Sequence, residues 1–583
     1  MSDDTDGPGS GATPDRRGFL RGLAAAAGTG LAARLADRDI LRPVRAAEPT
    51  STTEPDPQGD TDRTFPQSVM SGGPTTSGVI LWTRIAPEAH DPDADVVVQV
   101  AADPGFAYRV LERSVPGTAV GPEGDHCLKV DLDGELESNT EYHYRFLHRG
   151  TASPVGRCRT LPAAGEADEV SLALMACQDY QNGYYGAYSR VARADVDFIV
   201  HLGDFVYESA DGAFIAPEKG VREGRDFDLP SGASRAETLA DFRTLYRTYK
   251  SDPLLQQGLE AHTLIAGWDD HEIANNRYWD YAAEAPGLPG RGGDREFALD
   301  LTANGIQAWV EHMPARVEYD PEAETLHDQF RLWRTVEFGD LLELVVTDER
   351  LFRDPPPCRD GDVLTCFSED DPDRTMLGAR QREWWKSRMR ESTATWTAWL
   401  NEVLSMPLTV GTGWGQVEFV HDSWDGYQAE RYELMQALRG VDNAVALTGD
   451  LHCSMAGYME ASYGEFGGDS DERVGVELMT PAVSSINAAN VIDLPSSWDE
   501  EGLNDVALNQ NPHLQYVDWY RNGYSLVRFD GEECRFTAYA VDSETDAADA
   551  EQAKLAEFVV PEGEVSLREQ YNRFEENAGS DIV

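Results

Sequence analysis

Short apolar runs separated by turn residues make up most of residues 63–163. Runs of alternating or β-branched composition cover residues 78–84, 95–101, 126–131, 141–148 and 156–161. Turn dipeptides such as Asp91-Pro92 and Asp133-Gly134 lie between them. Several short strands at this spacing predict a β-sandwich of about 100 residues.

After Pro162 the pattern changes, and apolar runs alternate with longer helical patterns. The predicted strands are 171–176, 197–202, 263–268, 341–347, 395–400 and 444–448, followed by β-like runs at 474–479, 524–529 and 534–541. The predicted helices are 186–194, 236–257, 296–312, 378–390 and 430–439. This alternation predicts an α/β catalytic domain. The insertions 211–233 and 282–295 are candidate lids over a site.

The charge of the chain excludes one class of function. The 583 residues include 49 Lys+Arg and 104 Asp+Glu, which gives a formal net charge of −55. Such a field repels nucleic acid and anionic membrane surfaces, so we expect no nucleic-acid-binding surface. The carboxylates are dispersed and lysines are few, which suits a solvent of high ionic strength. We interpret the chain as haloarchaeal; an acidic mesophilic protein is the alternative.

The first residues are typical of an export signal. Arg16-Arg17 precedes Phe19-Leu20 and a weakly apolar Ala/Gly-rich run. This order predicts a twin-arginine signal peptide over residues 1–47, with residues 48–62 as a linker; the alternative is a disordered arm with a chance arginine pair. No later stretch has about 18 uninterrupted apolar residues, so we expect no transmembrane segment. The predicted location is extracellular, with the twin-arginine translocase as a partner during export.

Seven cysteines in an exported chain leave at least one thiol outside intramolecular disulfides. Cys358 and Cys366 flank an acidic loop and form a natural local pair. Cys127 and Cys158, both in the first β region, could also pair. Cys177 follows a predicted strand and is the candidate for an unpaired thiol with a chemical role.

Polar residues follow the ends of four predicted strands. These segments are Ala176-Cys177-Gln178-Asp179, the stretch from His201 to Glu208, the stretch from Trp268 to Asn276, and Thr448-Gly449-Asp450-Leu451-His452. Open α/β sheets place their sites at such strand ends. So many carboxylates, imidazoles and a thiol at one edge would be costly without compensation, and bound cations are the simplest compensation.

The residue pattern of these segments resembles the motifs of one protein family. Gly203-Asp204 with Tyr207, Asp269-Asp270-His271-Glu272 with Asn275-Asn276, and Gly449-Asp450 with His452 resemble the alkaline phosphatase D (PhoD) family of the metallophosphoesterases. Stretches 65–85, 347–354, 377–385, 422–427 and 511–519 also agree, in the right order. Purple acid phosphatase is the runner-up, but it keeps Asp where Cys177 stands and has histidines that this chain lacks.

The resemblance implies roles for ten residues. The expected metal ligands are Cys177, Asp204, Tyr207, Asp270, Asn275, Asp450 and His452, and the expected catalytic residues are His271, Arg350 and Arg353. The cofactors implied are Fe³⁺ and Ca²⁺. His271 would contact the phosphate or the leaving group, oriented by Asp269 or Glu272, and one of the arginines would clamp substrate. Asp179 is either a ligand or a turn residue.

These inferences combine into one hypothesis. We expect a fibronectin III or immunoglobulin-like β-sandwich over residues 63–163, then a catalytic domain of two β-sheets flanked by helices over 164–545, and an acidic extension over 546–583. The expected function is a secreted alkaline phosphatase that hydrolyses phosphomonoesters and phosphodiesters with metal-activated water. The alternatives are a phosphodiesterase or phospholipase-type enzyme acting on lipid or polymer diesters, and a catalytically silent metal-binding surface protein.

Overall fold

The computed structural model describes residues 59–215, 219–289, 293–357, 369–410, 417–418, 422–464, 472–491 and 500–574. The predicted signal peptide, most of the predicted linker, and Cys358 and Cys366 lie outside these ranges. Among the described residues, no helix combines the length and apolar character that a membrane span needs.

The N-terminal strands form two sheets that share one apolar core. The first sheet contains β1 (Val69–Thr75), β2 (Gly78–Arg84) and β5 (Cys127–Asp131). The second contains β3 (Val96–Ala101), β4 (Arg109–Val115), β6 (Glu141–His148), β7 (Thr151–Ala152) and β8 (Gly156–Arg159). Leu81 of β2 packs in one core with Val98 of β3. The more specific assignment to a fibronectin III or immunoglobulin type stays a prediction.

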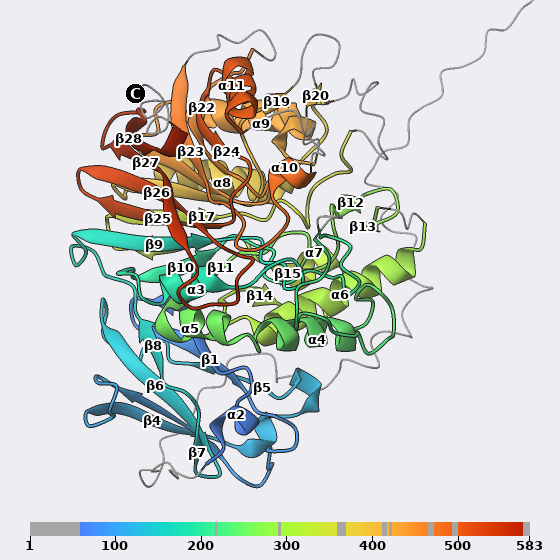
Figure 1. The fold of residues 1–583 in the computed structure, drawn as a ribbon, viewed down its shortest axis with the longest axis vertical. Coiled ribbons are helices and arrows are strands. Elements are labelled where there is room, and N and C mark those ends of the chain that lie inside the picture. Colours follow the sequence, from blue (N-terminus) through green and yellow to red (C-terminus); the bar gives the residue numbers. More distant parts are fainter. Residues whose placement is uncertain are drawn as a thin grey trace, which may run out of the picture.

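The first of these sheets does not end within the N-terminal region. β1 pairs in parallel with β11 (Thr263–Ala266), with Gly72 opposite Leu264. A Cβ on Gly72 would lie 2.6 Å from the Pro314 carbonyl oxygen, so the close approach requires glycine. The N-terminal strands therefore extend the central sheet of the following domain, as the lower half of Figure 1 shows.

The central sheet has ten strands in the order β28-β27-β26-β25-β9-β10-β11-β1-β2-β5. Its parallel part is β9 (Glu169–Met175), β10 (Phe198–His201) and β11. Its antiparallel part is β25 (Gly523–Asp530), β26 (Glu533–Val541), β27 (Gln552–Pro561) and β28 (Arg568–Asn572). Residues 552–572, which the sequence places in an extension, thus supply the last two strands of this sheet.

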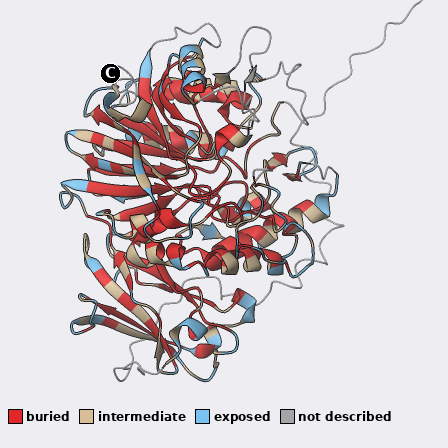
Figure 2. Cartoon of the chain, viewed as in Figure 1, coloured by how far each residue is buried: buried red, intermediate tan, exposed pale blue. Residues whose placement is uncertain are grey.

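A second sheet of seven strands packs against the first. It contains, in spatial order, β16 (Arg334–Phe338), β17 (Leu342–Val346), β18 (Trp396–Asn401), β21 (Ala444–Thr448), β23 (Arg473–Met479), β22 (Ser454–Glu460) and β24 (Leu514–Asp518). Leu172 and Val200 of the first sheet share an apolar core with Leu344 and Leu447 of the second. The strands are buried along most of their length (Figure 2), which confirms a mixed α/β fold with several sheets.

Helices cover the outer faces of both sheets. α3 (Gly186–Val191), α4 (Leu239–Tyr249), α5 (Pro253–Ala261) and α6 (Arg295–His312) cover the first, and α8 (Gly378–Glu391) and α9 (Gln428–Ala437) cover the second. The range 236–257, predicted to be largely helical, contains α4 and most of α5, which are separate helices because the proline ring at position 253 cannot continue α4. α4 ends at Tyr249, and the Asp252 carboxylate caps α5 by accepting from the backbone N–H groups of Leu254 and Leu255.

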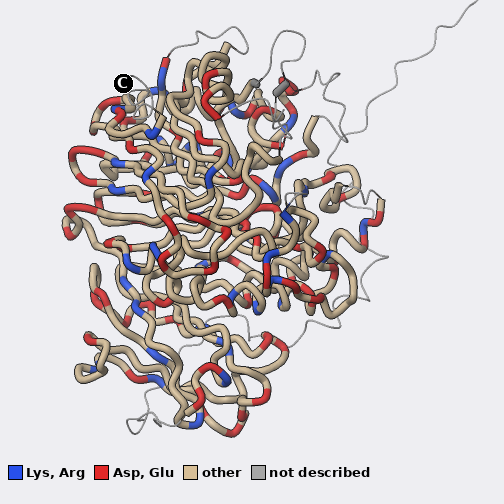
Figure 3. The backbone as a smooth tube through the Cα atoms, in the orientation of Figure 1, with Lys and Arg blue, Asp and Glu red and all other residues tan. Residues whose placement is uncertain are grey.

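The remaining elements are short or peripheral. They are α2 (Thr61–Thr64), α7 (Leu326–Gln329), α10 (Ala488–Val491), α11 (Glu500–Gln510), β12 (Tyr278–Asp280), β13 (Ala285–Gly287), β14 (Glu318–Tyr319), β15 (Phe330–Arg331), β19 (Thr409–Val410) and β20 (Val417–Glu418), with 3₁₀ turns at Gly117–Ala119, Pro122–Gly124 and Trp424–Tyr427. Acidic residues are spread over the whole tube in Figure 3 rather than gathered in one segment.

Candidate active site

Strained backbone marks the strand ends where the sequence places its chemistry. Cys177 follows β9 with φ 53°, Asp204 follows β10 with φ 56°, and Asp450 and His452 follow β21 with φ 65° and 56°. Residues other than glycine rarely adopt this left-handed region, and such strain concentrates at functional sites. Gly203, at φ 138°, passes so close to the next loop that a Cβ would lie 2.5 Å from the Asp269 Cβ.

A first cluster joins the two sheets through a thiol, a carboxylate, an imidazole and a phenol. Single donor atoms of Cys177, Asp204 and His452 lie within 4.8 Å of one another. The Tyr207 hydroxyl donates to Asp204 Oδ2 at 2.9 Å and lies 3.2 Å from His452 Nε2. The Ser485 hydroxyl donates to the Tyr207 oxygen at 2.7 Å. The donor set of this cluster fits a transition-metal cation.

A second group of carboxylates lies beside the first. Asp269, Asp270 and Asp450 bring one oxygen each within 4.8 Å of one another, and an oxygen each of Asp204 and Asp270 lies within the same distance of a His271 ring nitrogen. Asp204 therefore lies in the cluster with Cys177 and His452 and also in the one with Asp270 and His271. The oxygen-only donors of Asp269, Asp270 and Asp450 fit a hard cation such as a divalent alkaline-earth ion.

The electrostatics of the first cluster also fit a cation. Burial, followed by the charges of Asp204 and Asp269, raises the pKa of the Cys177 thiol, and burial raises the pKa of the Asp204 carboxyl. A bound cation reverses these shifts, because it stabilises the deprotonated ligands. His452 is prepared for such a role: its Nδ1 lies 2.6 Å from the Ile486 carbonyl oxygen, which leaves Nε2 facing Tyr207.

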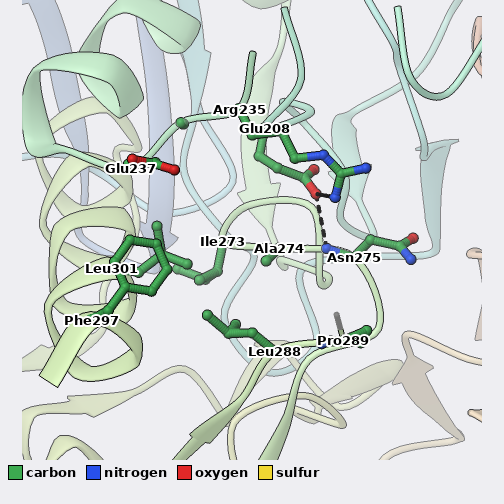
Figure 4. Close-up of a pocket in the computed structure, with 11 residues that line it drawn as sticks. Glu208, Arg235, Glu237, Ile273, Ala274, Asn275, Leu288, Pro289, Phe297 and Leu301 are labelled. Atoms are coloured by element: carbon green, nitrogen blue, oxygen red, sulfur yellow. Dashed lines mark hydrogen bonds and ion pairs between the residues drawn. The ribbon is translucent and has the colours of Figure 1, made fainter. Parts of the chain in front are cut away.

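His271 is oriented by Glu208, and the prediction of Asp269 or Glu272 for this role is wrong. Its Nδ1 lies 2.7 Å from Glu208 Oε2. The other Glu208 oxygen, Oε1, accepts from the Asn275 backbone N–H at 3.1 Å, and Figure 4 draws this second contact. Burial lowers the pKa of the His271 imidazole, but the carboxylates of Asp204 and Glu208 outweigh this effect and hold the pKa well above its usual value. The sequence feature that could have indicated this role is the position of Glu208 directly after Tyr207, in the same turn.

Glu272 instead connects two strand ends through the backbone. Its carboxylate accepts from the N–H groups of Asp204 at 3.0 Å, Phe205 at 2.6 Å and Asp269 at 2.7 Å. The side chain is fully buried, and it fixes the loop after β10 against the loop after β11. The spacing of Asp204 and Asp270 therefore depends on a residue that touches neither carboxylate.

Arg350 lies inside the site and is surrounded by carboxylates. Its guanidinium is completely buried and contacts Asp269, Asp450 at 2.5 Å, Asp422 at 3.5 Å and Asp270 at 3.7 Å. Burial raises the pKa of Asp270, but Arg350 and His271 outweigh it and lower the pKa overall. The geometry favours Arg350 as a cation that positions these carboxylates, and its predicted contact with phosphate stays a prediction.

Three further expectations can be compared with the geometry. Arg353 is buried, with its Nε donating to the Arg277 carbonyl at 2.8 Å. Asp179 accepts from the Gln181 backbone N–H at 2.9 Å, which favours its role as a turn residue. The Asn275 carboxamide points away from the apolar side chains in Figure 4, and its role as a ligand stays a prediction.

The predicted pairing of Cys127 with Cys158 is wrong. Both are buried free thiols within the described residues. Cys127 begins β5 in the first sheet and lies 3.8 Å from His312 Nε2, whereas Cys158 belongs to β8 in the second sheet.

Comparisons with known proteins agree with this geometry. The family description PhoD-like phosphatase matches residues 172–538, and PhoD-like phosphatase, N-terminal domain, matches residues 50–162. Alkaline phosphatase D of Bacillus subtilis (strain 168) is 32% identical over 522 residues, covering 88% of this chain and 82% of that protein. A solved structure of PhoD superposes with a TM-score of 0.75 at 28% identity, covering 89% of this chain and 94% of that one.

A purple acid phosphatase from yellow lupin (Lupinus luteus) seeds is more distant, with a TM-score of 0.47 at 13% identity, covering 85% of this chain and 74% of that one. The two family descriptions together match most of the chain. The chain belongs to the PhoD-like phosphatase family, and this membership supports the function of a phosphoester hydrolase.

Proposed function

We propose that this phosphoester hydrolase is a secreted alkaline phosphatase that releases phosphate from monoesters and diesters. The observation that carries the proposal is the convergence of a thiol, a phenol, an imidazole and carboxylates from the ends of β9, β10, β11 and β21. Cys177, Asp204, Tyr207 and His452 would hold Fe³⁺. Asp270, Asp450 and Asn275, with Asp204 shared, would hold Ca²⁺.

Different residues of the site have different roles in the proposed hydrolysis. When bound, the cations would acidify water and neutralise charge that develops on the phosphoryl oxygens. His271 keeps Nδ1 against Glu208, so its other nitrogen is available to donate a proton to the leaving alkoxide. Arg350 holds Asp269 and Asp450 in place, and Glu272 holds the loops that carry Asp204 and Asp270. Export by the twin-arginine translocase and function in high salt belong to the same proposal.

The experiment that tests the proposal compares wild type with Cys177→Ala and Cys534→Ala in high salt. Cys534 is also a buried free thiol but lies in β26 outside the site, so it is the matched control. Metal content is measured together with hydrolysis of one phosphomonoester and one phosphodiester. We expect iron and calcium in wild type and in Cys534→Ala, and loss of iron and activity in Cys177→Ala. Full iron and full activity in Cys177→Ala would refute the thiol ligand.

A further inference from the structure

A pocket lies beside the candidate active site, on the side of Glu208 that faces α6. Its apolar walls are Ala236, Ile273, Ala274, Leu288, Phe297 and Leu301, and Glu208, Arg235 and Asn275 are among its polar residues. Figure 4 shows Phe297, Leu301 and Ile273 on one side, Leu288 below, and Glu208 with Asn275 opposite. The pocket is partly open, and its volume of about 70 Å³ holds on the order of five to seven water-sized groups, enough for a short alkyl chain or an aromatic ring.

The pocket and the active site share a wall. Glu208 is 1% exposed and lines the pocket, and it lies 2.7 Å from the Nδ1 of His271. Asn275, whose backbone N–H bonds the same carboxylate, also lines the pocket, and its carboxamide points away from the apolar walls. Glu208 and Asn275 therefore line the pocket while Glu208 also contacts His271, so the pocket adjoins the candidate active site.

The apolar side chains that line the pocket favour an apolar group as its ligand. Ile273, Leu288 and Leu301 are each less than 8% exposed, so they present a preformed apolar surface in a chain whose net charge is −55. Such a surface gains free energy when it covers apolar groups and loses it when it strips water from hydroxyls. Arg235 is the lining residue with a positive charge; its side chain is 47% exposed and lies 3.9 Å from Glu208. This guanidinium can meet the anionic end of an ester while the walls hold its apolar end.

We propose that this pocket binds the organic group of the substrate, and that the enzyme prefers phosphoesters of apolar alkyl or aryl alcohols to those of polyols. The inference rests on the proposed phosphoester hydrolysis and adds a substrate class to it. Each methylene that enters the pocket is expected to raise kcat/KM by up to about fourfold until the pocket is full.

The test measures phosphate release by the metal-loaded enzyme from ethyl, propyl, butyl and hexyl phosphate, with glycerol phosphate as the polar match to propyl phosphate. Wild type should show a rise of kcat/KM with chain length and should prefer propyl phosphate to glycerol phosphate. Phe297→Ala should flatten the rise of kcat/KM with chain length. Leu299→Ala, on the same helix but outside the pocket, should keep the wild-type slope.

A second variant on another wall, Leu288→Ala, should also flatten the rise, and it keeps the test decisive if Phe297→Ala does not fold. Hydrolysis of all esters at a rate independent of chain length would overturn the pocket assignment and leave the proposed function standing. Absence of hydrolysis for every ester, with metals bound, would overturn the proposed function and this inference with it.

Discussion

Replacing Glu208 by Gln tests how the site orients its imidazole. The carboxylate serves two groups at once, His271 Nδ1 at 2.7 Å and the Asn275 N–H at 3.1 Å. A carboxamide offers one oxygen, so one of these groups must face its NH₂ instead. A hydrogen bond to a charged group contributes about 1.5–3 kcal/mol, which predicts a fall in kcat of about ten- to 150-fold.

The assay is steady-state hydrolysis of a phosphomonoester by enzyme whose iron and calcium contents are measured in the same preparation. Glu237→Gln is the matched control, because Glu237 is another carboxylate that lines the same pocket. We expect its kcat to stay within about twofold of wild type, as for most substitutions away from such contacts. A Glu208→Gln enzyme with wild-type metal content and wild-type kcat would refute the orienting role.

Three further outcomes are expected. Glu272→Ala leaves three buried backbone N–H groups without their acceptor. Denaturant titrations should therefore show that the free energy of unfolding falls by at least about 3 kcal/mol. A loss below about 1 kcal/mol would contradict the role of Glu272 in connecting the two loops. Burial and then Arg157 lower the pKa of His262 to about 4, so its contribution is complete above its usual pKa of about 6.5 and is lost as pH falls toward 4. His262→Gln should therefore flatten the acid loss of unfolding free energy by on the order of 3 kcal/mol, and an unchanged pH dependence would contradict this. The net charge of −55 makes the carboxylates of the chain repel one another, and salt screens this repulsion. The melting temperature and the activity should therefore rise between 0.1 and 1 M salt, where the Debye length falls from about 10 to about 3 Å. Full, stable activity at low salt would contradict the halophile interpretation.

The sequence predicted the parts of the site that are local. Asp204 and Asp270 come shortly after β10 and β11, which are neighbours in one sheet, so the pattern predicted that they converge. Asp450 follows β21 of the other sheet, and its place beside them depends on how the two sheets stack. β1 and β4 were missed because the Gly-Pro content of Val69–Thr75 and the charges of Arg109–Val115 hide their alternation.

The contacts between segments could not be predicted in the same way. Arg350 meets Asp269 only because β17 and β11, in different sheets, end at the same place. Ser485 reaches Tyr207 across 278 positions of the chain, and Glu272 bonds backbone groups rather than a side chain. Such contacts depend on how two sheets are stacked, which no local pattern encodes.

The pairing of β1 with β11 has a consequence for how the molecule can be divided. β11 leads directly into the loop that carries Asp269, Asp270 and His271, and one of its edges is completed by a strand about 190 positions earlier. A fragment that begins at residue 164 would expose that edge, with its unpaired backbone groups, to other copies of itself. The boundary between the two family descriptions therefore divides the sequence but does not separate two independent folding units. We expect the catalytic region to fold correctly only when it is expressed together with the N-terminal strands.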